Sequence, residues 1–546
     1  MTPALDAAPA ASDDRPQTTR AVPLVLFALV AGSIGTMSIG NAFELSTAWV
    51  PLVFLVASLA AAGLFIRARV PLPVLRRGEH AAALGLATIL ALPRVPYLFE
   101  PLVGAAFDAA CWDDWWHVQE LASIVHSPSF PLRSTFVPDA LFSFYYAAWM
   151  PGAAAFLASV LVTAKQALFV DIALLQIMAA YAVVYAGHVL CGSDVRRRHV
   201  LVGAVVFFGG FDAVYGVATM ATNWLRGTSH AIPHAEWWPT AVGFELQHSN
   251  IVTLALWVPH HLAAAVAVGF VLMLLSRPLT PMRGAVAGVA FTYAAFASAF
   301  VWLGALPFVA WVVLRHRPAL TGLGVCAVVS AALALPNAWM YLRSDAPGIE
   351  WFGVVQDYWY ERGFWWSLPA FVGVLAVEFL PLLVALRIGR REHAEHRVPL
   401  LLAAAFLLST YVVAYHGANN YATRGAAVPI LVLVYCAVPG LSTLATTRTW
   451  RTWVLVPFFL GGLWELASFS NAARHAYMHV TPFHRAVLAS NLRHGEAPSA
   501  ELQEAADEVP EGWYLIENHR QTAKPRLRES DQELFTRDQR LRVSLR

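Results

Sequence analysis

The sequence predicts an all-α polytopic membrane protein with about 12–14 transmembrane helices. Hydrophobic residues make up 58% of the 546 positions and charged residues only 13%, which is too little charge to cover a soluble protein of this length. Blocks of roughly 18 to 25 apolar residues recur along the chain, and an α-helix of that length crosses a bilayer. The blocks are continuously apolar, whereas the strands of a membrane β-barrel would alternate, so a barrel is excluded.

The first three apolar blocks predict the orientation of the chain. Residues 1–20 are rich in Ala, Asp and Pro and are expected to form a disordered cytoplasmic tail. Spans are expected at about 21–40, 47–66 and 81–98, the first of them an uncleaved span rather than a signal peptide. Positive residues prefer the cytoplasmic side, so residues 99–140 form a large extracytoplasmic loop rich in acidic and aromatic residues. The basic residues behind this assignment lie between the second and third spans: Arg67, Arg69, Arg76 and Arg77.

Further apolar blocks complete a transmembrane bundle over residues 21–471. The block at 140–163 is interrupted by Met150-Pro151-Gly152, so it is expected to be re-entrant or broken rather than a full crossing. The block at 284–314 is long enough for two short crossings. Residues 472–546 have an ordinary soluble composition and are expected to form a small C-terminal tail. The other blocks lie at about 167–190, 199–222, 249–275, 319–341, 367–387, 398–415, 424–446 and 452–471.

The extracytoplasmic loop is a candidate for chemistry, because carboxylates near hydrocarbon are costly unless they are paired, solvated or functional. On a helix, Asp113, His117 and Glu120 share one face, and the neighbouring tryptophans share the opposite face. Such a helix would lie in the membrane interface, with carboxylates toward water or a cavity. A carboxylate there could act as a general base or hold a divalent cation such as Mg²⁺ or Mn²⁺. The alternative is a solvated interfacial helix whose acids have no chemical role.

Other polar side chains lie inside or beside the later blocks. His260 and His261 follow a proline within an apolar block, and ionisable groups in the membrane often mark functional sites. Arg424 begins a block on the extracytoplasmic side, where it could bind a phosphate or pair with an acid of the loop. Tyr145 and Tyr146 lie where the loop re-enters the membrane, a position that an aromatic belt also explains.

Several classes of function are excluded by what the sequence lacks. It contains no GxxxxGK[ST], HExxH or GxSxG motif, so a P-loop ATPase, a zincin and an α/β-hydrolase have no support. The four cysteines are far apart and predict neither a disulfide framework nor a CxxC metal site. The net charge is only +2 and no basic patch interleaved with aromatic residues is present, so no nucleic-acid partner is expected.

The arrangement resembles the GT-C superfamily of membrane glycosyltransferases, which use polyprenyl-phosphate-linked sugars. The similarity consists of Asp113-Asp114-Trp-Trp-His117 in the first large external loop, a re-entry that ends in Phe-Tyr-Tyr at Tyr146, and a bundle of many spans. In that superfamily an acidic residue of this loop serves as general base or metal ligand. The resemblance therefore implies a catalytic role for Asp113 or Asp114, with Asp108 in reserve.

The chain also resembles bacterial polytopic proteins that have a Trp-x-Pro-x-His element and an Asn-(Asp/Asn)-x-x-x-Arg loop. Here these elements are Trp257–His261 and Asn419–Arg424. Two departures stand out: two extra spans precede the acidic loop, and no WWDYG element is present, which disfavours an oligosaccharyltransferase. The resemblances imply contact between a lipid-linked sugar and the following residues: Asp108, His117, Tyr145, Tyr146, His260, His261, Asn419, Asn420 and Arg424.

Two functions are compatible with these features. The first is an integral-membrane glycosyltransferase of the cell envelope that transfers a sugar from a polyprenyl-phosphate donor to an extracytoplasmic acceptor. The second is a polytopic transporter or lipid flippase with a polar path through the bundle. No internal repeat is evident and the acids cluster in one loop, which favours the enzyme. The expected partners are the lipid-linked donor and membrane lipids, and the Ala/Arg-rich, Lys-poor composition is typical of a protein of a bacterial inner membrane.

Overall fold

Over the residues that it describes, the computed structural model is predominantly helical, which confirms the predicted fold class. The residues that it describes form no strand, and the β-bridge between Ser46 and Ser129 is an isolated one. The described residues are 21–98, 114, 117, 120–121, 123–125, 127–132, 146–159, 162, 164–227, 248–343, 363–390, 392, 396–413, 420–447 and 450–475.

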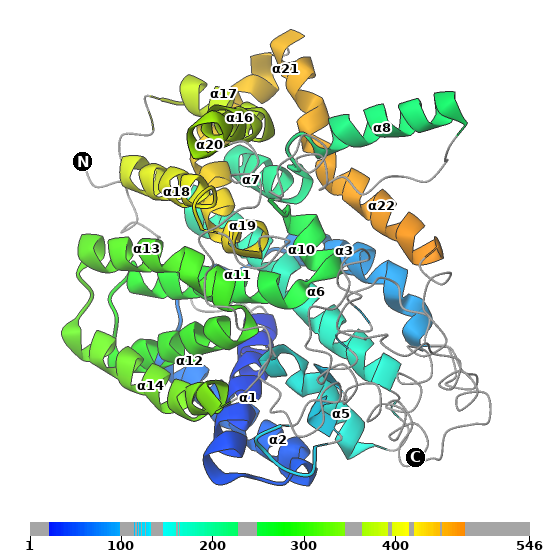
Figure 1. Cartoon of the computed structure of the whole chain (residues 1–546). Helices are drawn as coiled ribbons and strands as arrows, with labels where there is room; N and C mark the ends of the chain where they lie inside the picture. Colours follow the sequence, from blue (N-terminus) through cyan, green and yellow to red (C-terminus); the bar gives the residue numbers. More distant parts are fainter. Residues whose placement is uncertain are drawn as a thin grey trace.

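The helices are labelled in Figure 1. In chain order they are α1 (Ala21–Phe43), α2 (Val50–Ala68), α3 (Arg77–Ala91), α5 (Met150–Ala158), α6 (Ala164–Cys191), α7 (Val195–Phe207), α8 (Asp212–Arg226), α10 (Ile251–Trp257), α11 (Pro259–Leu275), α12 (Pro281–Ala297), α13 (Ala299–His316), α14 (Leu320–Arg343), α16 (Phe364–Glu378), α17 (Leu380–Ile388), α18 (Arg397–Ser409), α19 (Asn420–Gly425), α20 (Ala427–Thr447), α21 (Trp450–Leu455) and α22 (Gly461–His475). The 3-10 helices are η2 (Thr47–Trp49), η3 (Leu92–Leu98), η4 (Tyr146–Trp149) and η7 (Val456–Phe459).

The number of membrane-spanning helices is lower than the sequence predicted. Within the described residues, seven helices are long and apolar enough to cross a membrane, or nine spans if each of two bent pairs counts as one. The difference arises because breaks divide several apolar blocks: Val258 separates α10 from α11, and Ser298 separates α12 from α13. The block at 140–163 is broken as predicted, since α5 has nine residues. A helix of that length spans about 13.5 Å, less than half of a bilayer core.

Basic residues gather at one end of the bundle, called here the arginine-rich end. The Arg283 Nε donates to the carbonyl of Ala68, at the end of α2 (3.3 Å). Glu79, in the first turn of α3, lies 2.7 Å from the His188 Nε2 of α6 and accepts a hydrogen bond from Arg198 of α7 (3.2 Å). These contacts place the basic linkers after α2, α6 and α11 at the same end of the bundle, as expected for linkers that share one side of a membrane.

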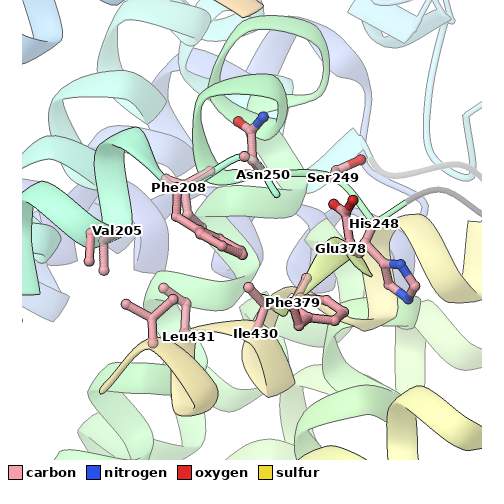
Figure 2. Close-up of a pocket in the computed structure, with 13 residues that line it drawn as sticks. Val205, Phe208, His248, Ser249, Asn250, Glu378, Phe379, Ile430 and Leu431 are labelled. Carbon is pink, nitrogen blue, oxygen red and sulfur yellow. The ribbon is translucent and has the colours of Figure 1, made fainter. Parts of the chain in front are cut away.

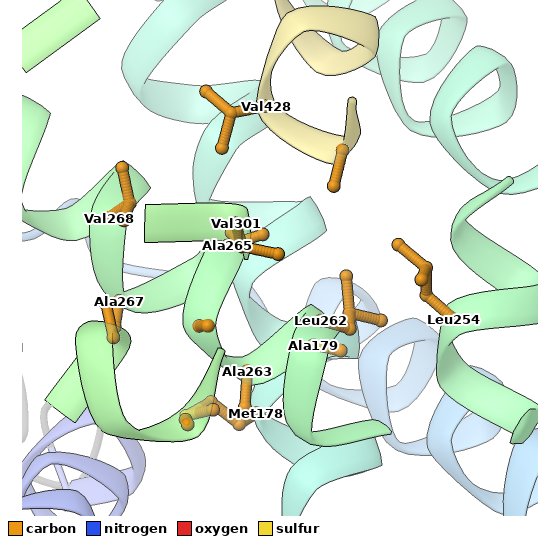
Figure 3. Close-up of a cluster of buried hydrophobic side chains, with 14 of the residues drawn as sticks. Met178, Ala179, Leu254, Leu262, Ala263, Ala265, Ala267, Val268, Val301 and Val428 are labelled. Atoms are coloured by element: carbon orange, nitrogen blue, oxygen red, sulfur yellow. The ribbon is translucent and has the colours of Figure 1, made fainter. Parts of the chain in front are cut away.

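Helix α11 lies at the centre of the bundle, between α13 and α6 (Figure 1). Its apolar side chains pack against helices from three other parts of the chain, as Figure 3 shows. Ala263 and Ala265 belong to this cluster together with Met178 of α6, Val301 of α13 and Val428 of α20. Small side chains on α11 let neighbouring helices approach closely, which is how helices associate inside a membrane.

Within the acidic loop, the described positions between 114 and 125 are helical, and they are called here the loop helix. His117 and Glu120 are helical, as the periodicity predicted, and so is Asp114; all three side chains are buried. Of the two orientations expected for the carboxylates, toward water or toward a cavity, burial excludes bulk water for Glu120. After the helix, the Phe130 N–H donates to the carbonyl of Leu45 between α1 and α2 (2.8 Å). This contact places the end of the loop opposite to the arginine-rich end.

Candidate functional site

Asp114 is bound by a buried arginine. Arg94, in η3, donates hydrogen bonds to both oxygens of the Asp114 carboxylate; the shorter ones run from Nε to Oδ2 (2.8 Å) and from Nη2 to Oδ1 (2.7 Å). The Tyr97 hydroxyl donates another to Oδ2 (2.7 Å). The side chains of Arg94 and Asp114 are both completely buried. A two-point arginine–carboxylate pair of this kind fixes the relative orientation of the two segments that contribute it.

Arg94 also contacts two further helices. Its Nη2 donates to the carbonyl of Leu256 in α10, and its guanidinium lies 4.9 Å from the ring centroid of Phe469 in α22. Arg94 therefore holds the loop helix against α10 and α22. Because the Asp114 carboxylate is engaged by Arg94 and Tyr97, it is poorly placed to accept a proton from a substrate. Asp113, the other catalytic candidate, lies outside the described residues.

The loop helix brings a histidine to the intramembrane His pair. The ring centroid of His117 lies 4.5 Å from that of Trp149 and 5.3 Å from that of His260. Trp149 and His260 are 5.6 Å apart, and His260 and His261 are 4.0 Å apart. All four side chains are buried. We call this group, completed by Ser298 below, the histidine cluster.

His261 is oriented by the serine at the break between α12 and α13. Its Nδ1 lies 2.7 Å from the Ser298 Oγ. The same oxygen accepts a hydrogen bond from the Val301 N–H (3.2 Å) and so caps the N-terminus of α13. The Ser298 side chain therefore both caps the start of α13 after the break and orients the His261 ring.

Arg424 adds a positive charge beside the histidine cluster. It lies in α19, close enough to His260 and His261 to interact electrostatically with both rings. Its position depends on the contact between Gly425 and Gly304 of α13: a Cβ on Gly304 would lie 2.1 Å from the Gly425 carbonyl oxygen. Only a residue without a side chain allows this approach.

Of the other predicted site residues, some are described by the structure and the rest lie outside the described residues. The Tyr146 hydroxyl, which is buried, accepts a hydrogen bond from Asn41 Nδ2 of α1 (3.0 Å) and donates one to the Met340 sulfur of α14 (2.9 Å). Tyr146 thus links two helices rather than lying in an aromatic belt. Asn420 is the first residue of α19. Asp108, Asp113, Tyr145 and Asn419 lie outside the described residues.

Four residues of the site escaped prediction: Arg94, Tyr97, Trp149 and Ser298. A signal for Arg94 was present, since it is a charged residue between two prolines in an otherwise apolar segment. The other three have no distinguishing local pattern. Their roles depend on the packing of distant segments, which one sequence does not reveal.

A second polar region lies where two bent spans meet. α7 and α8 form a pair bent by 42°, and α16 and α17 a pair bent by 70°. Glu378, the last residue of α16, accepts a hydrogen bond from the Phe211 N–H at the first bend (3.1 Å). Figure 2 shows Glu378 with His248, Asn250 and other residues around a cavity of about 10 Å³ at this junction.

Among the described residues, no group of three or more His, Cys, Asp or Glu side chains is placed to hold a metal ion. The divalent cation suggested by the acidic loop therefore stays a prediction that concerns residues outside the described part. Comparison of the chain with protein-family models, with curated proteins and with solved structures gave no match. The geometry of the two polar regions is thus the basis for assigning a function.

Proposed function

We propose that the protein is an integral-membrane glycosyltransferase that transfers a sugar from a polyprenyl-phosphate donor to an acceptor outside a bacterial inner membrane. The observation on which this depends is the meeting of three distant segments at one place. His117 of the loop helix contacts His260 of α11, and Arg424 of α19 lies beside the same histidines. The acidic loop, the His pair and the Arg loop were each candidates from the sequence alone.

The position of the histidine cluster suits an acceptor on the extracytoplasmic side of the membrane. The loop helix is anchored at the end of the bundle opposite to the arginine-rich end. Basic residues favour the cytoplasmic side, so the loop helix would be extracytoplasmic. A donor whose hydrocarbon tail lies in the bilayer would present its phosphate and sugar near the extracytoplasmic end of the bundle.

The polar groups of the cluster suit a leaving phosphate. Arg424 supplies a permanent positive charge, and the N–H of an imidazole ring can donate a hydrogen bond to a phosphate oxygen. In a water-poor site such donors stabilise the negative charge that develops on the leaving group. His260 and His261 would then bind the phosphate together with Arg424, and Trp149 would form one wall of the site.

A residue of the acidic loop would supply the base. The acceptor hydroxyl oxygen forms a bond with the anomeric carbon, and the bond from that carbon to the phosphate oxygen breaks with its electron pair on the phosphate. The proton of the hydroxyl passes to a carboxylate. Asp113 is assigned this role because Arg94 engages the neighbouring Asp114 and fixes the helix that follows.

The test is consumption of a labelled donor by purified protein in lipid vesicles. A panel of polyprenyl-phosphate-linked hexoses and pentoses is supplied to wild type and to Arg424→Gln. We expect turnover of one donor by wild type and a loss of about 100-fold or more in Arg424→Gln. The matched control is Arg226→Gln, at the exposed end of α8, which should keep wild-type turnover. Equal turnover by wild type and Arg424→Gln, or turnover of no donor by wild type, contradicts the proposal.

One observation favours the alternative of a transporter or lipid flippase. The two bent spans meet around a cavity, and broken helices at membrane depth commonly form the sites of transporters. The same vesicles separate the two functions. Transport or flipping moves a labelled donor between leaflets without chemical change, whereas the enzyme releases polyprenyl phosphate. Movement without cleavage would replace the proposed enzyme by the alternative.

A further inference from the structure

One buried carboxyl group takes no part in the two polar regions described above. Asp171 lies on α6, five residues and about 7.5 Å of helix inside the candidate span Gln166–Cys191. Its exposed fraction is only 1%. The short helix α5 packs against α6 (Figure 1). An ionisable side chain at membrane depth commonly marks a functional site, so the partners of Asp171 decide what it does.

Asp171 caps α5 from the neighbouring helix. The residue at the N-cap of α5 is Trp149, whose side chain makes no capping hydrogen bond. Gly152 is the third residue of α5, and the N–H groups of the first turn have no partner within their own helix. The Gly152 N–H donates instead to the Asp171 Oδ1 (2.6 Å). One oxygen of the carboxyl group is therefore engaged.

The other carboxyl oxygen lies close to a second acceptor. A Cβ on Gly152 would lie 2.2 Å from the Asp171 Oδ2 and 2.6 Å from the Ala167 carbonyl oxygen, one turn earlier on α6. Both oxygens are thus close to the same point of α5. In the part of the chain that the structure describes, Oδ2 has no hydrogen-bond partner. Two acceptor oxygens in this position repel each other unless one of them carries a proton.

No basic side chain among the described residues neutralises this carboxyl group, since Asp171 belongs to none of the ion pairs that these residues form. The Tyr293 hydroxyl of α12 is close enough to Asp171 to interact with it electrostatically. The titratable groups of α3 and α7 lie at the arginine-rich end. The titratable groups of the other elements that pack against α6 make the contacts already described: Arg94, Tyr97, Tyr146, His260 and His261.

These surroundings fit a neutral carboxylic acid better than a carboxylate. An ionised carboxylate inside a bundle requires a cation or several hydrogen-bond donors, and here it would have one N–H. A carboxylic acid requires one donor for its carbonyl oxygen and one acceptor for its hydroxyl group. The Gly152 N–H is such a donor and the Ala167 carbonyl oxygen such an acceptor.

We propose that Asp171 is a proton-binding site inside the membrane. A proton from water adds to Oδ2, and the resulting hydroxyl group donates to the Ala167 carbonyl oxygen, while Oδ1 keeps the hydrogen bond from the Gly152 N–H. The side chain becomes neutral and both of its oxygens have partners. Because α5 starts directly after Trp149, the bound proton also stabilises the helix that positions this ring in the histidine cluster. The site does not depend on the proposed sugar transfer.

The test is infrared spectroscopy of the purified full-length protein in lipid at neutral pH. A protonated carboxyl group gives a carbonyl stretching band that an ionised one lacks. The amide of Asp171→Asn can accept from Gly152 and donate to Ala167, as the protonated acid does, so this variant should fold. We expect its difference spectrum against wild type to show the loss of one such band. The matched control is Asp194→Asn, an exposed helix cap, which should lose none. A carboxyl spectrum that is identical in wild type and Asp171→Asn overturns the proposal.

A second variant decides the matter if Asp171→Asn does not fold. Tyr293→Phe keeps the buried ring and removes the hydroxyl group that interacts with Asp171. The frequency of a carboxyl band depends on the local electric field, so we expect the band to shift in this variant. The matched control is Tyr215→Phe on α8, which should leave the band in place. Identical bands in wild type and Tyr293→Phe refute a protonated Asp171.

Discussion

Replacement of Arg94 by methionine should destabilise the protein by about 3–5 kcal/mol, because it leaves the buried Asp114 carboxylate without its positive partner. Methionine has a similar length and no charge, so packing is largely kept. Most of the predicted loss therefore comes from the unpaired carboxylate and the donors that Arg94 supplies. The loop helix depends on this pair for its position, so His117 should also separate from the histidine cluster.

The assay is unfolding of the purified protein by SDS in mixed micelles, followed by circular dichroism. The matched control is Arg197→Met, which removes an arginine from the exposed pair with Asp194 (3.2 Å). Exposed pairs contribute about 0–1 kcal/mol, so this control should lose little. The double variant Arg94→Met with Asp114→Asn should lose less than the sum of the two single losses, since no unpaired charge remains buried. If Arg94→Met loses no more than Arg197→Met, the buried pair does not have the role assigned to it.

Three further predictions concern the cluster, the arginine-rich end and the broken helix. His260→Phe keeps an aromatic ring beside Trp149 but removes the ring nitrogens. Donor turnover should fall about 100-fold with little change in the free energy of unfolding. Unchanged turnover would exclude His260 from the reaction. Although burial opposes ionisation of Glu79, hydrogen bonds from the Arg76 N–H and His188 hold its pKa below the usual 4.5. The stabilising effect of the ionised carboxylate is therefore present above pH 4.5 and is lost as the pH falls through the lowered pKa. Glu79→Gln should show a smaller drop in melting temperature on acidification than wild type, and an equal drop contradicts this expectation. Gly152→Ala should destabilise the protein, because its Cβ would lie 2.2 Å from an Asp171 oxygen, whereas Gly63→Ala in open space should not; equal melting temperatures would refute the close contact.

Much of the fold could be predicted from the sequence because bilayer physics restricts it. Long apolar blocks must be helical, since no other local structure satisfies their backbone in lipid. Basic residues between blocks favour one side of a membrane, and the contact of Arg283 with Ala68 brings two basic linkers together at one end of the bundle. The Pro151-Gly152 pair predicted the break at the start of α5. The number of crossings was harder to predict. The break at Val258 is signalled only by Pro259, which membrane helices can tolerate, and the break at Ser298 has no comparable signal.

The histidine cluster was only partly predictable. His260 and His261 stood out because ionisable groups in an apolar block are costly, and His117 because it shared a helical face with acids. The contact between His117 and His260 joins segments more than a hundred residues apart, and local sequence contains no information about such pairing. For the same reason Arg94 could not be identified as the partner of Asp114. Without that partner, Asp114 looked like a free catalytic acid.

The junction of the two bent spans was not predicted. Its glycines, including Gly209, have no distinguishing sequence pattern. Their role depends on which distant segments pack against each other at the junction. Glu378 stands alone among apolar residues and could have been noticed as an intramembrane acid. Its hydrogen bond to the Phe211 N–H, however, joins positions on different spans.

The most direct test of the proposed reaction is the turnover of the labelled donor by Asp113→Asn. The asparagine keeps the shape of the side chain but cannot accept the proton of the acceptor hydroxyl. We predict a loss of about 100-fold or more relative to wild type, with full turnover in Asp194→Asn, an exposed helix cap at the arginine-rich end. Wild-type turnover by Asp113→Asn would contradict the assignment of the acidic loop as the catalytic element.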